Sequence, residues 1–295
     1  MDNDKAIKYR QSLDDKNFFN IMKLKNMPKY FGWVNHSINN NLDVKLFLGG
    51  DDDGVALRCF WNNHYEEQTL KLWLELTQIE GIIFDIGAHT GIYSLIANRS
   101  INKGAVFSFE PYYMNFARLN LNLRANSIST ENAFMLAVGS EKGNLPFSVD
   151  TNADYLTSGG KLGAFSKKKI FSVQTITIDE FLDKEAQTHV KVIKIDVEGH
   201  EFQCLKGMEM TLSKSKPIIF FECISKTNTL LIENFLKNMN YKLFLIDDLN
   251  LKIKEVSTLE PYFDLDGKII HTSINRIAIE SSKMNLIKWK EVIYQ

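Results

Sequence analysis

From residue 81 onward, short apolar runs alternate with stretches of helical periodicity, and this alternation constrains the fold more than any other feature of the chain. Strands joined by helices form βαβ units, which build a mostly parallel sheet covered on both faces. The expected strands are 82–86, 105–110, 132–138, 190–196, 217–223, 241–246 and 274–280, and the expected helices are 91–99, 112–125, 200–214 and 228–239. The pattern therefore predicts an α/β fold, with the cleanly alternating segment 274–280 as an antiparallel edge strand.

The chain before residue 64 lacks this alternation, and we interpret it as an N-terminal extension of residues 1–63 on a main domain of residues 64–295. A loosely periodic helix is expected within 5–26. The runs 42–48 and 55–61 both alternate, and a turn rich in glycine and aspartate separates them, so we expect a β-hairpin.

Three further elements are expected outside the alternating strands and helices. An amphipathic helix over 65–79 precedes the first strand, and a last short helix covers 284–293. The long stretch between the third and fourth strands contains a hairpin-like pair at 145–149 and 169–177.

Charge and composition exclude several classes of protein. With 35 basic and 36 acidic residues the net charge is -1, whereas a nucleic-acid binder usually carries a basic excess, so no nucleic-acid partner is expected. No apolar run approaches the roughly 20 residues of a membrane helix. The three cysteines have no metal-binding spacing, and the first residues have no signal-peptide pattern, so we expect a cytoplasmic protein. The oligomeric state is left open.

Ligands of open α/β sheets bind at the carboxyl ends of the strands, so the residues after each strand are the candidates for a site. The first strand ends at Asp85, and Gly87, Ala88, His89 and Gly91 lead into the next helix. Glycines let a ligand approach the backbone closely, and the helix N-terminus attracts an anionic group. We expect these five residues to contact a cofactor.

The second strand ends at Glu110, 25 residues after Asp85, where an acidic side chain can accept both hydroxyls of a ribose. This pair of features also occurs in NAD enzymes, so a nucleotide-dependent oxidoreductase or binding module is an alternative. The dinucleotide fingerprint, however, has glycine where this loop has His89. The bulkier loop favours an adenosine joined to a single amino-acid carboxylate over a pyrophosphate.

The fourth strand ends in a cluster of ionisable side chains, namely Asp196, Glu198, His200 and Glu201. Such clusters are typical of functional sites, although the two glutamates could instead serve to stabilise the start of the next helix. Glu222, at the end of the fifth strand, either faces the same cleft or is solvated at an edge. Asp196, Glu198, Glu201 and Glu222 have the oxygen ligands that Mg²⁺ or Ca²⁺ prefers. A divalent metal is therefore an alternative, but it is not predicted.

Several of these segments together resemble the FkbM family of methyltransferases. The resemblance covers about residues 64–224 and is strongest in 83–94, 107–111, 137–139 and 193–201, where DIGA-x-x-G and IDVEG-x-E stand in this chain. The family usually has asparagine where this chain has His89. Leu205-Lys206-Gly207, Asn120–Leu123 and Tyr65-Glu66 also match.

The resemblance implies a Rossmann-like seven-stranded methyltransferase sheet, S-adenosylmethionine as the methyl donor, and a hydroxyl acceptor, most often on a sugar of a surface glycan or glycolipid. A methyltransferase with a non-sugar acceptor is an alternative. Ala137 is expected near the adenine, and Asp196 is expected to contact the cofactor near the methyl group. A general base would speed transfer to a hydroxyl, and Asp196 is the first candidate because it lies at the strand end, followed by His200 and Glu198.

Overall fold

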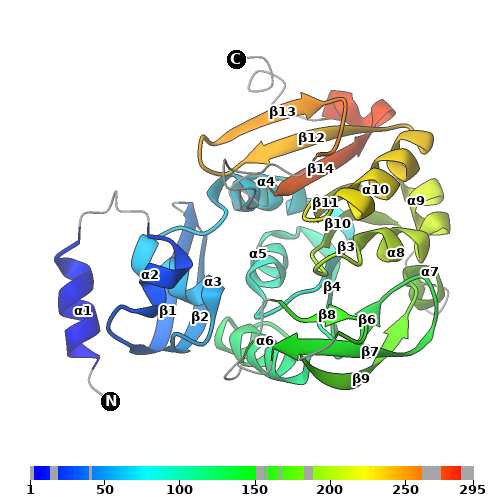
Figure 1. Ribbon diagram of the computed structural model, residues 1–295. Coiled ribbons are helices and arrows are strands. Elements are labelled where there is room, and N and C mark those ends of the chain that lie inside the picture. Colours follow the sequence, from blue (N-terminus) through cyan, green and yellow to red (C-terminus); the bar gives the residue numbers. More distant parts are fainter. Residues whose placement is uncertain are drawn as a thin grey trace.

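The computed structural model describes residues 3–13, 19–39, 42–150, 156, 159–165, 168–182, 189–260 and 274–286 (Figure 1). The helices are α1 (Asp4–Gln11), α2 (Ile21–Lys25), α3 (Gly54–Asn62), α4 (Glu67–Thr77), α5 (Ile92–Ser100), α6 (Tyr113–Ala125), α7 (Ile178–Leu182), α8 (Glu201–Lys206), α9 (Glu209–Ser215) and α10 (Lys226–Asn238), with a short 3₁₀ helix η2 (Ser281–Leu286). The strands are β1 (Tyr30–Asn39), β2 (Leu42–Gly50), β3 (Glu80–Ile86), β4 (Lys103–Phe109), β5 (Ala133–Phe134), β6 (Ala137–Val138), β7 (Gly143–Asp150), β8 (Lys161–Leu162), β9 (Lys168–Ile176), β10 (Val190–Ile195), β11 (Ile218–Glu222), β12 (Tyr241–Asp247), β13 (Lys252–Val256) and β14 (Asn275–Glu280).

The main sheet has the strand order β13-β12-β14-β11-β10-β3-β4-β5. The pairs β3–β4, β4–β5, β3–β10 and β10–β11 are parallel, and β14 runs antiparallel to both of its neighbours. This confirms the predicted α/β, Rossmann-like sheet with an antiparallel last strand. The order reverses between β3 and β10, and that reversal marks the edge where ligands of such sheets bind.

Period-two alternation along the strands divides the apolar side chains between two cores. Ile83 of β3 faces a core shared with α4, α5 and α6, whereas Ile82 and Phe84 face a second core shared with α7 to α10. Successive strand residues point to opposite faces, so both faces of a sheet need an apolar cover. The helices on the two sides of the sheet provide it (Figure 1).

The last strand is antiparallel, as predicted, but it is not an edge strand. β14 lies between β11 and β12, and all six of its residues are buried. An additional strand, β13, pairs with β12 and forms that edge of the sheet instead. The prediction took the polar residues of 274–280 to be exposed at an edge. Arg276 and Glu280 are instead buried, and hydrogen bonds and an ion pair satisfy their charged groups.

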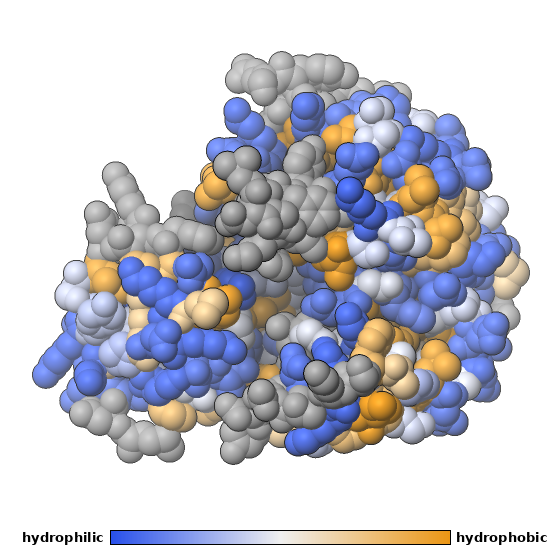
Figure 2. All heavy atoms as spheres, in the orientation of Figure 1, coloured by the Kyte–Doolittle hydropathy of each residue, from blue (hydrophilic) through white to orange (hydrophobic). Residues whose placement is uncertain are grey.

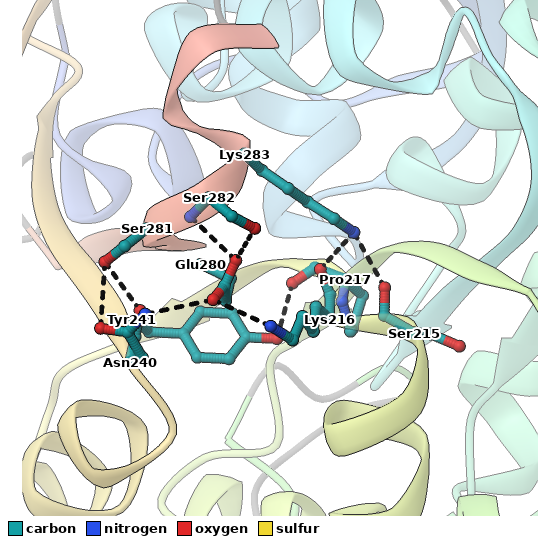
Figure 3. Close-up of polar contacts among 9 residues, drawn as sticks. All are labelled: Ser215, Lys216, Pro217, Asn240, Tyr241, Glu280, Ser281, Ser282 and Lys283. Atoms are coloured by element: carbon teal, nitrogen blue, oxygen red, sulfur yellow. Dashed lines mark hydrogen bonds and ion pairs between the residues drawn. The ribbon is translucent and has the colours of Figure 1, made fainter.

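The partners of Glu280 cluster at the end of β14 (Figure 3). The Glu280 carboxylate accepts hydrogen bonds from the Ser282 backbone at 2.9 Å and from Asn240, and it forms an ion pair with Lys216 at 3.1 Å. The hydrogen bond from Ser282 and the contact with Lys216 lower the pKa of Glu280 to about 2, although burial opposes the shift. The carboxylate thus ties β14 to the ends of α9 and α10.

The predicted hairpin of 42–48 with 55–61 is wrong, although 42–48 does belong to a different hairpin. β1 pairs antiparallel with β2, whereas residues 55–61 belong to helix α3. Asp53 caps α3, since its carboxylate accepts hydrogen bonds from the backbone of Val55 and Ala56. Seven of the nine α3 residues are buried, so apparent alternation there carried no information about strand pairing.

The hairpin docks onto α6 through asparagine side chains. Asn122 accepts a hydrogen bond from the Phe47 backbone at 2.9 Å and donates one to the Thr90 carbonyl at 2.8 Å. Asn126 bonds in both directions with the Lys45 backbone. Side-chain amides therefore satisfy the outer edge of β2, which would otherwise present unpaired backbone groups. One apolar core extends from the hairpin into the main sheet, and the boundary at residue 63 stays a prediction.

Smaller differences concern the boundaries of elements. The expected helix within 5–26 consists of α1 and α2, the expected helix 200–214 is divided into α8 and α9, and the helix 65–79 corresponds to α4. The expected strand 132–138 comprises β5 in the main sheet and β6 in a separate sheet with β9, β7 and β8. The predicted pair 145–149 and 169–177 is confirmed as β7 and β9. Of the expected last helix, 284–286 belongs to η2 and 287–293 lies outside the described residues.

Figure 2 shows that most of the visible face of the molecule is hydrophilic, with smaller apolar patches between the charged residues. Among the residues described, no helix is long and apolar enough to span a membrane.

Candidate active site

A cleft of about 670 Å³ opens at the carboxyl ends of β3, β4, β10 and β11. The cleft is also lined by residues of α3 and by residues 64–66 before α4, and the β12–β13 turn contributes Asp248. Of the predicted site residues, Gly87, Ala88, His89, Gly91, Glu110, Ala137, Asp196 and Glu198 line the cleft. Asp85 and His200 do not line it. The strand order brings these segments together, as expected at a reversal point.

The loop after β3 is held against two neighbouring strands. Gly87 and Ala88 both donate backbone hydrogen bonds to the Phe109 carbonyl at 2.9 Å. Gly87 has a φ of +81°, and a Cβ there would lie 1.8 Å from the Asp196 carbonyl oxygen. Only glycine therefore fits at this position. His89 also has a positive φ, +50°, and its ring Nδ1 lies 3.3 Å from the Thr90 hydroxyl.

Glu110 joins this loop to the end of β4. Its carboxylate accepts hydrogen bonds from the backbones of His89 and Tyr112, both at 2.9 Å, and its side chain is almost fully buried. Burial raises the pKa of Glu110 to about 8, although these hydrogen bonds oppose the shift. The side chain thus reaches the cleft from the strand next to the glycine loop.

Asp85 has a supporting position beneath the loop. It accepts a hydrogen bond from the Ser94 hydroxyl, which lies 2.7 Å from the Ser108 hydroxyl. Burial raises the pKa of Asp85 to about 6, against the effect of the Ser94 hydrogen bond and of Lys194. Asp85 therefore links β3, α5 and β4 and does not face the cleft.

A buried lysine that the sequence analysis missed lies under Asp196. Lys194 of β10 is fully buried, its ammonium nitrogen lies 3.2 Å from the Asp196 carboxylate, and it is 4.9 Å from the centroid of the Tyr93 ring. Burial alone would lower the pKa of Lys194, but the carboxylates of Asp196, Glu222 and Glu66 outweigh it and the pKa is raised. The lysine is therefore a permanent cation below the cleft.

Two of its acidic neighbours reach the cleft from other elements. Glu222, at the end of β11, is buried, and burial followed by the charge of Asp196 raises its pKa well above the ordinary value. Glu66 precedes α4 and accepts a hydrogen bond from the Tyr93 hydroxyl. The sequence signal for Lys194 was a lysine between two apolar residues at the end of a strand, but nothing local could pair it with Glu66, which lies 128 residues earlier.

The segment after β10 separates its ionisable residues. Glu198 has a φ of +54° and lines the cleft, and burial with the charges of Asp196 and Glu201 raises its pKa to about 8. Glu201 is buried, and its carboxylate accepts hydrogen bonds from the Gly199 backbone and from the Asn228 side chain. His200 is directed toward Gly139, and burial lowers its pKa. Only Asp196 and Glu198 of this segment's charged side chains therefore reach the cleft.

The suggested metal ligands do not converge. Among the parts of the chain that the structure describes, no group of three or more His, Cys, Asp or Glu side chains is arranged to hold a metal ion. Glu201 is directed into the helix start, and the Asp196 carboxylate contacts the Lys194 ammonium, which occupies the position next to it.

Comparison with known proteins identifies the family. Residues 85–243 match the profile of the methyltransferase FkbM domain. The hexuronic acid methyltransferase AglP of Haloferax volcanii is 28% identical over 154 residues, which is 52% of this chain and 61% of that protein. The chain therefore spans less than two thirds of this curated relative.

Two solved structures show weaker similarity. The methyltransferase FkbM from Methylobacillus flagellatus KT is 15% identical with a TM-score of 0.42, covering 77% of this chain and 53% of that one. A putative methyltransferase from Streptococcus mutans, solved in complex with SAH, is 8% identical with a TM-score of 0.43, covering 72% of this chain and 96% of that one. The match over more than half of the chain decides between the methyltransferase and oxidoreductase alternatives: this chain belongs to the FkbM family of methyltransferases.

Proposed function

We propose that the chain transfers a methyl group from S-adenosylmethionine to a hydroxyl of a sugar in a glycan or glycolipid. The observation that carries the proposal is that Glu110 and Asp196 face one cleft from either side of the glycine loop. Glu110 can accept hydrogen bonds from the two ribose hydroxyls of a nucleoside. Asp196 lies where the methyl acceptor would meet the methyl donor. The action of the curated relative on hexuronic acid supports a sugar acceptor.

The residues around the loop fit the proposed donor. The N-terminus of α5 has no side-chain cap, so its free backbone N–H groups can bind the methionine carboxylate. Ala137 lines the cleft beyond Glu110, which suits a contact with the adenine. When bound, S-adenosylmethionine supplies a methyl group that is already activated for transfer. Asp85, which is buried below the loop, acts by positioning it.

Asp196 is the proposed general base. Its backbone N–H is bonded to the Ile86 carbonyl at 2.9 Å and its carboxylate to Lys194, so both ends of the residue are fixed. It would accept the proton that leaves the acceptor hydroxyl, a role worth about 10²–10⁴ in rate. Glu198, with a pKa of about 8, is mostly protonated at neutral pH and is the weaker candidate. His200 would act only if the segment rearranged.

An intracellular site of action is part of this proposal. All three cysteines, Cys59, Cys204 and Cys223, are buried free thiols, which suits a reducing compartment. Nucleic acid is not a proposed acceptor, because the chain lacks a basic excess.

Calorimetry with S-adenosylhomocysteine and with NAD tests the donor site directly. We expect S-adenosylhomocysteine to bind and NAD not to bind. Glu110→Ala should weaken binding tenfold or more, since hydrogen bonds to a charged acceptor contribute about 1.5–3 kcal/mol each. Glu131→Ala, at an exposed position, is the matched control. Unchanged affinity in the Glu110 variant would contradict the ribose assignment.

The same site predicts a pH dependence of donor binding. Because the pKa of Glu110 is raised to about 8, the free protein holds this side chain largely protonated at pH 7. The ribose hydroxyls donate best to the charged form, so affinity for S-adenosylhomocysteine should rise between pH 6.5 and 8.5. The Glu110→Ala variant should lack this rise in the same titration.

Transfer of labelled methyl from S-adenosylmethionine to cell-envelope fractions tests the acceptor. We expect the label in a sugar ether that resists mild alkali, and Asp196→Asn should reduce turnover while keeping donor affinity. Label confined to protein or RNA would replace the sugar by another acceptor. An Asp196→Asn variant with unchanged turnover would remove Asp196 as the base.

A further inference from the structure

Helix α3 contributes a cation to the lining of the cleft. Arg58 is the single charged residue of α3, whose other side chains are mostly buried, and it lines the cleft. Among the described residues that line the cleft, it is the only lysine or arginine. The acidic lining residues lie on other elements and are Glu66, Glu67, Glu110, Asp196, Glu198, Glu222 and Asp248.

The Arg58 guanidinium is positioned but has no acidic partner among the described residues. Its Nη1 donates a hydrogen bond to the Gly54 carbonyl at 3.0 Å, and its central carbon lies 5.9 Å from the centroid of the Tyr65 ring. It forms no ion pair with any part of the chain that the structure describes. A half-buried guanidinium with free donors is suited to a bidentate contact with a planar anion.

Tyr65 lies next to Arg58 and lines the cleft together with the proposed base, Asp196. Burial raises its pKa, the charges of Glu66 and Asp196 raise it further, and Arg58 lowers it. One tyrosine is therefore within electrostatic reach of both Arg58 and Asp196. The ring also offers an apolar surface on which a sugar can pack.

We propose that Arg58 binds the carboxylate of an acidic sugar acceptor and thereby holds a hydroxyl of the same sugar toward Asp196. This inference rests on the proposed sugar methyltransferase function and names the class of acceptor. Arg58 attracts the acidic group of the acceptor, and no other described residue that lines the cleft is a lysine or arginine, so charge gives the sugar one orientation in the cleft.

A second carboxylate competes for the same role, because the methionine part of the donor also carries one. The N-terminus of α5, where no side chain caps the helix, is the proposed site of that carboxylate, which leaves Arg58 for the acceptor. The two sources predict different effects of substituting Arg58, so they can be separated by binding measurements without turnover.

The test compares the binding of p-nitrophenyl β-glucuronide and p-nitrophenyl β-glucoside in the presence of S-adenosylhomocysteine. The two sugars differ only at C6, which is a carboxylate in the glucuronide and a hydroxymethyl group in the glucoside. We expect the full chain to bind the glucuronide at least tenfold more tightly, and Arg58→Gln to abolish the preference. Arg58→Lys should keep part of the preference, because lysine retains the positive charge but lacks the paired donors of the planar guanidinium. Arg99→Gln, exposed in the last turn of α5, is the control.

Each other outcome overturns the inference. If the full chain shows no preference for the glucuronide, there is no acidic subsite. If Arg58→Gln weakens S-adenosylhomocysteine binding and leaves the sugar preference intact, Arg58 binds the donor. If methyl appears as an alkali-labile ester of the glucuronide, the carboxylate itself is the acceptor. Failure of the proposed function is separate, since the unmodified chain would then not bind S-adenosylhomocysteine at all.

Discussion

Lys194 illustrates how one residue organises the floor of the cleft. Its ammonium lies among Asp196, Glu222 and Glu66, which come from three different elements, and under the Tyr93 ring. A buried cation of this kind holds neighbouring carboxylates in place, and its loss leaves uncompensated buried charge. The geometry of the proposed base thus depends on a residue outside the cleft.

Replacing Lys194 by methionine should therefore affect both stability and pH dependence. We expect the free energy of unfolding to fall by about 3–5 kcal/mol, the usual cost of breaking a buried ion pair. The pKa of Glu222, already raised by burial, should rise further without the cation. Because Glu222 lines the same cleft as the proposed base, the charge of the cleft should change at a higher pH, and we expect the acid limb of the kcat/KM profile to move up with it.

Urea unfolding and a pH profile of methyl transfer measure these effects. Lys191→Met, at the other and partly exposed lysine of β10, is the matched control. A Lys194 variant with the pH profile of the unmodified chain would show that this lysine is only structural.

At the scale of elements, loops and helices are positioned by contacts that cross the fold. The glycine loop packs its backbone against the carbonyl of Asp196, and Asn122 of α6 connects the N-terminal hairpin to the same loop through Thr90. The hairpin, the loop and the β10 end are therefore mechanically linked. Substitutions far from the cleft can change its shape through these links.

Gly87→Ala tests the close approach of the loop to β10. The added Cβ would lie 1.8 Å from a backbone oxygen, and φ is +81°. Backbone strain alone costs about 1–3 kcal/mol, and the steric clash adds to it, so we expect the variant to lose at least this much stability and to lose donor binding as well. Gly139→Ala is the comparison, because its Cβ would meet only His200, at 3.5 Å. Thermal unfolding of both variants gives the answer, and equal melting temperatures would argue against a strained loop.

Asn122→Ala tests the docking of the hairpin. The variant leaves the Phe47 backbone N–H and the Thr90 carbonyl without their partner, which costs about 1–3 kcal/mol per buried group. Asn120→Ala, which removes only a bond to the carbonyl four residues earlier on α6, should cost much less. Hydrogen exchange at Phe47 should become faster in the first variant and stay unchanged in the second.

Among the described residues, two large cores lie one on each face of the main sheet, and the hairpin extends the first of them. A third, smaller core includes residues of β6, β7 and β9. β14 lies inside the main sheet between β12 and β11, and Glu280, its last residue, makes the polar contacts drawn in Figure 3. Because β14 returns between β11 and β12, its position depends on chain contacts made over long sequence distances. The stability of the whole sheet should therefore depend on the charge of Glu280.

The pKa of Glu280 determines the pH range over which stability changes with the charge of this side chain. It is lowered to about 2 in the folded protein from an ordinary value of 4.5, so its contribution is full above pH 4.5 and is lost as the pH falls toward 2. Glu280→Gln should lower stability by about 1–3 kcal/mol at pH 7 and by progressively less below pH 4.5. Urea unfolding at several pH values measures this difference. Glu255→Gln, in an exposed ion pair with Lys242, should show little change at any pH.

The strands of the main sheet, the glycine loop and Glu110 could be predicted from the sequence because their signals are local. Apolar runs, turn residues and the spacing of Asp85 and Glu110 lie within short windows. The cluster of ionisable residues at the end of the fourth strand is a local signal too, and the structure places two of its members, Asp196 and Glu198, in the cleft.

The tertiary structure decided what depends on distant partners. It placed β14 inside the sheet, where burial of Arg276 and Glu280 is matched by hydrogen bonds that no alternation pattern reveals. It made 55–61 a helix, which brings Arg58 to the cleft, and it assembled Lys194 with Glu66 and Glu222. Local sequence specifies backbone preference and the order of elements, whereas the pairing of buried charges is settled only when separate elements pack together.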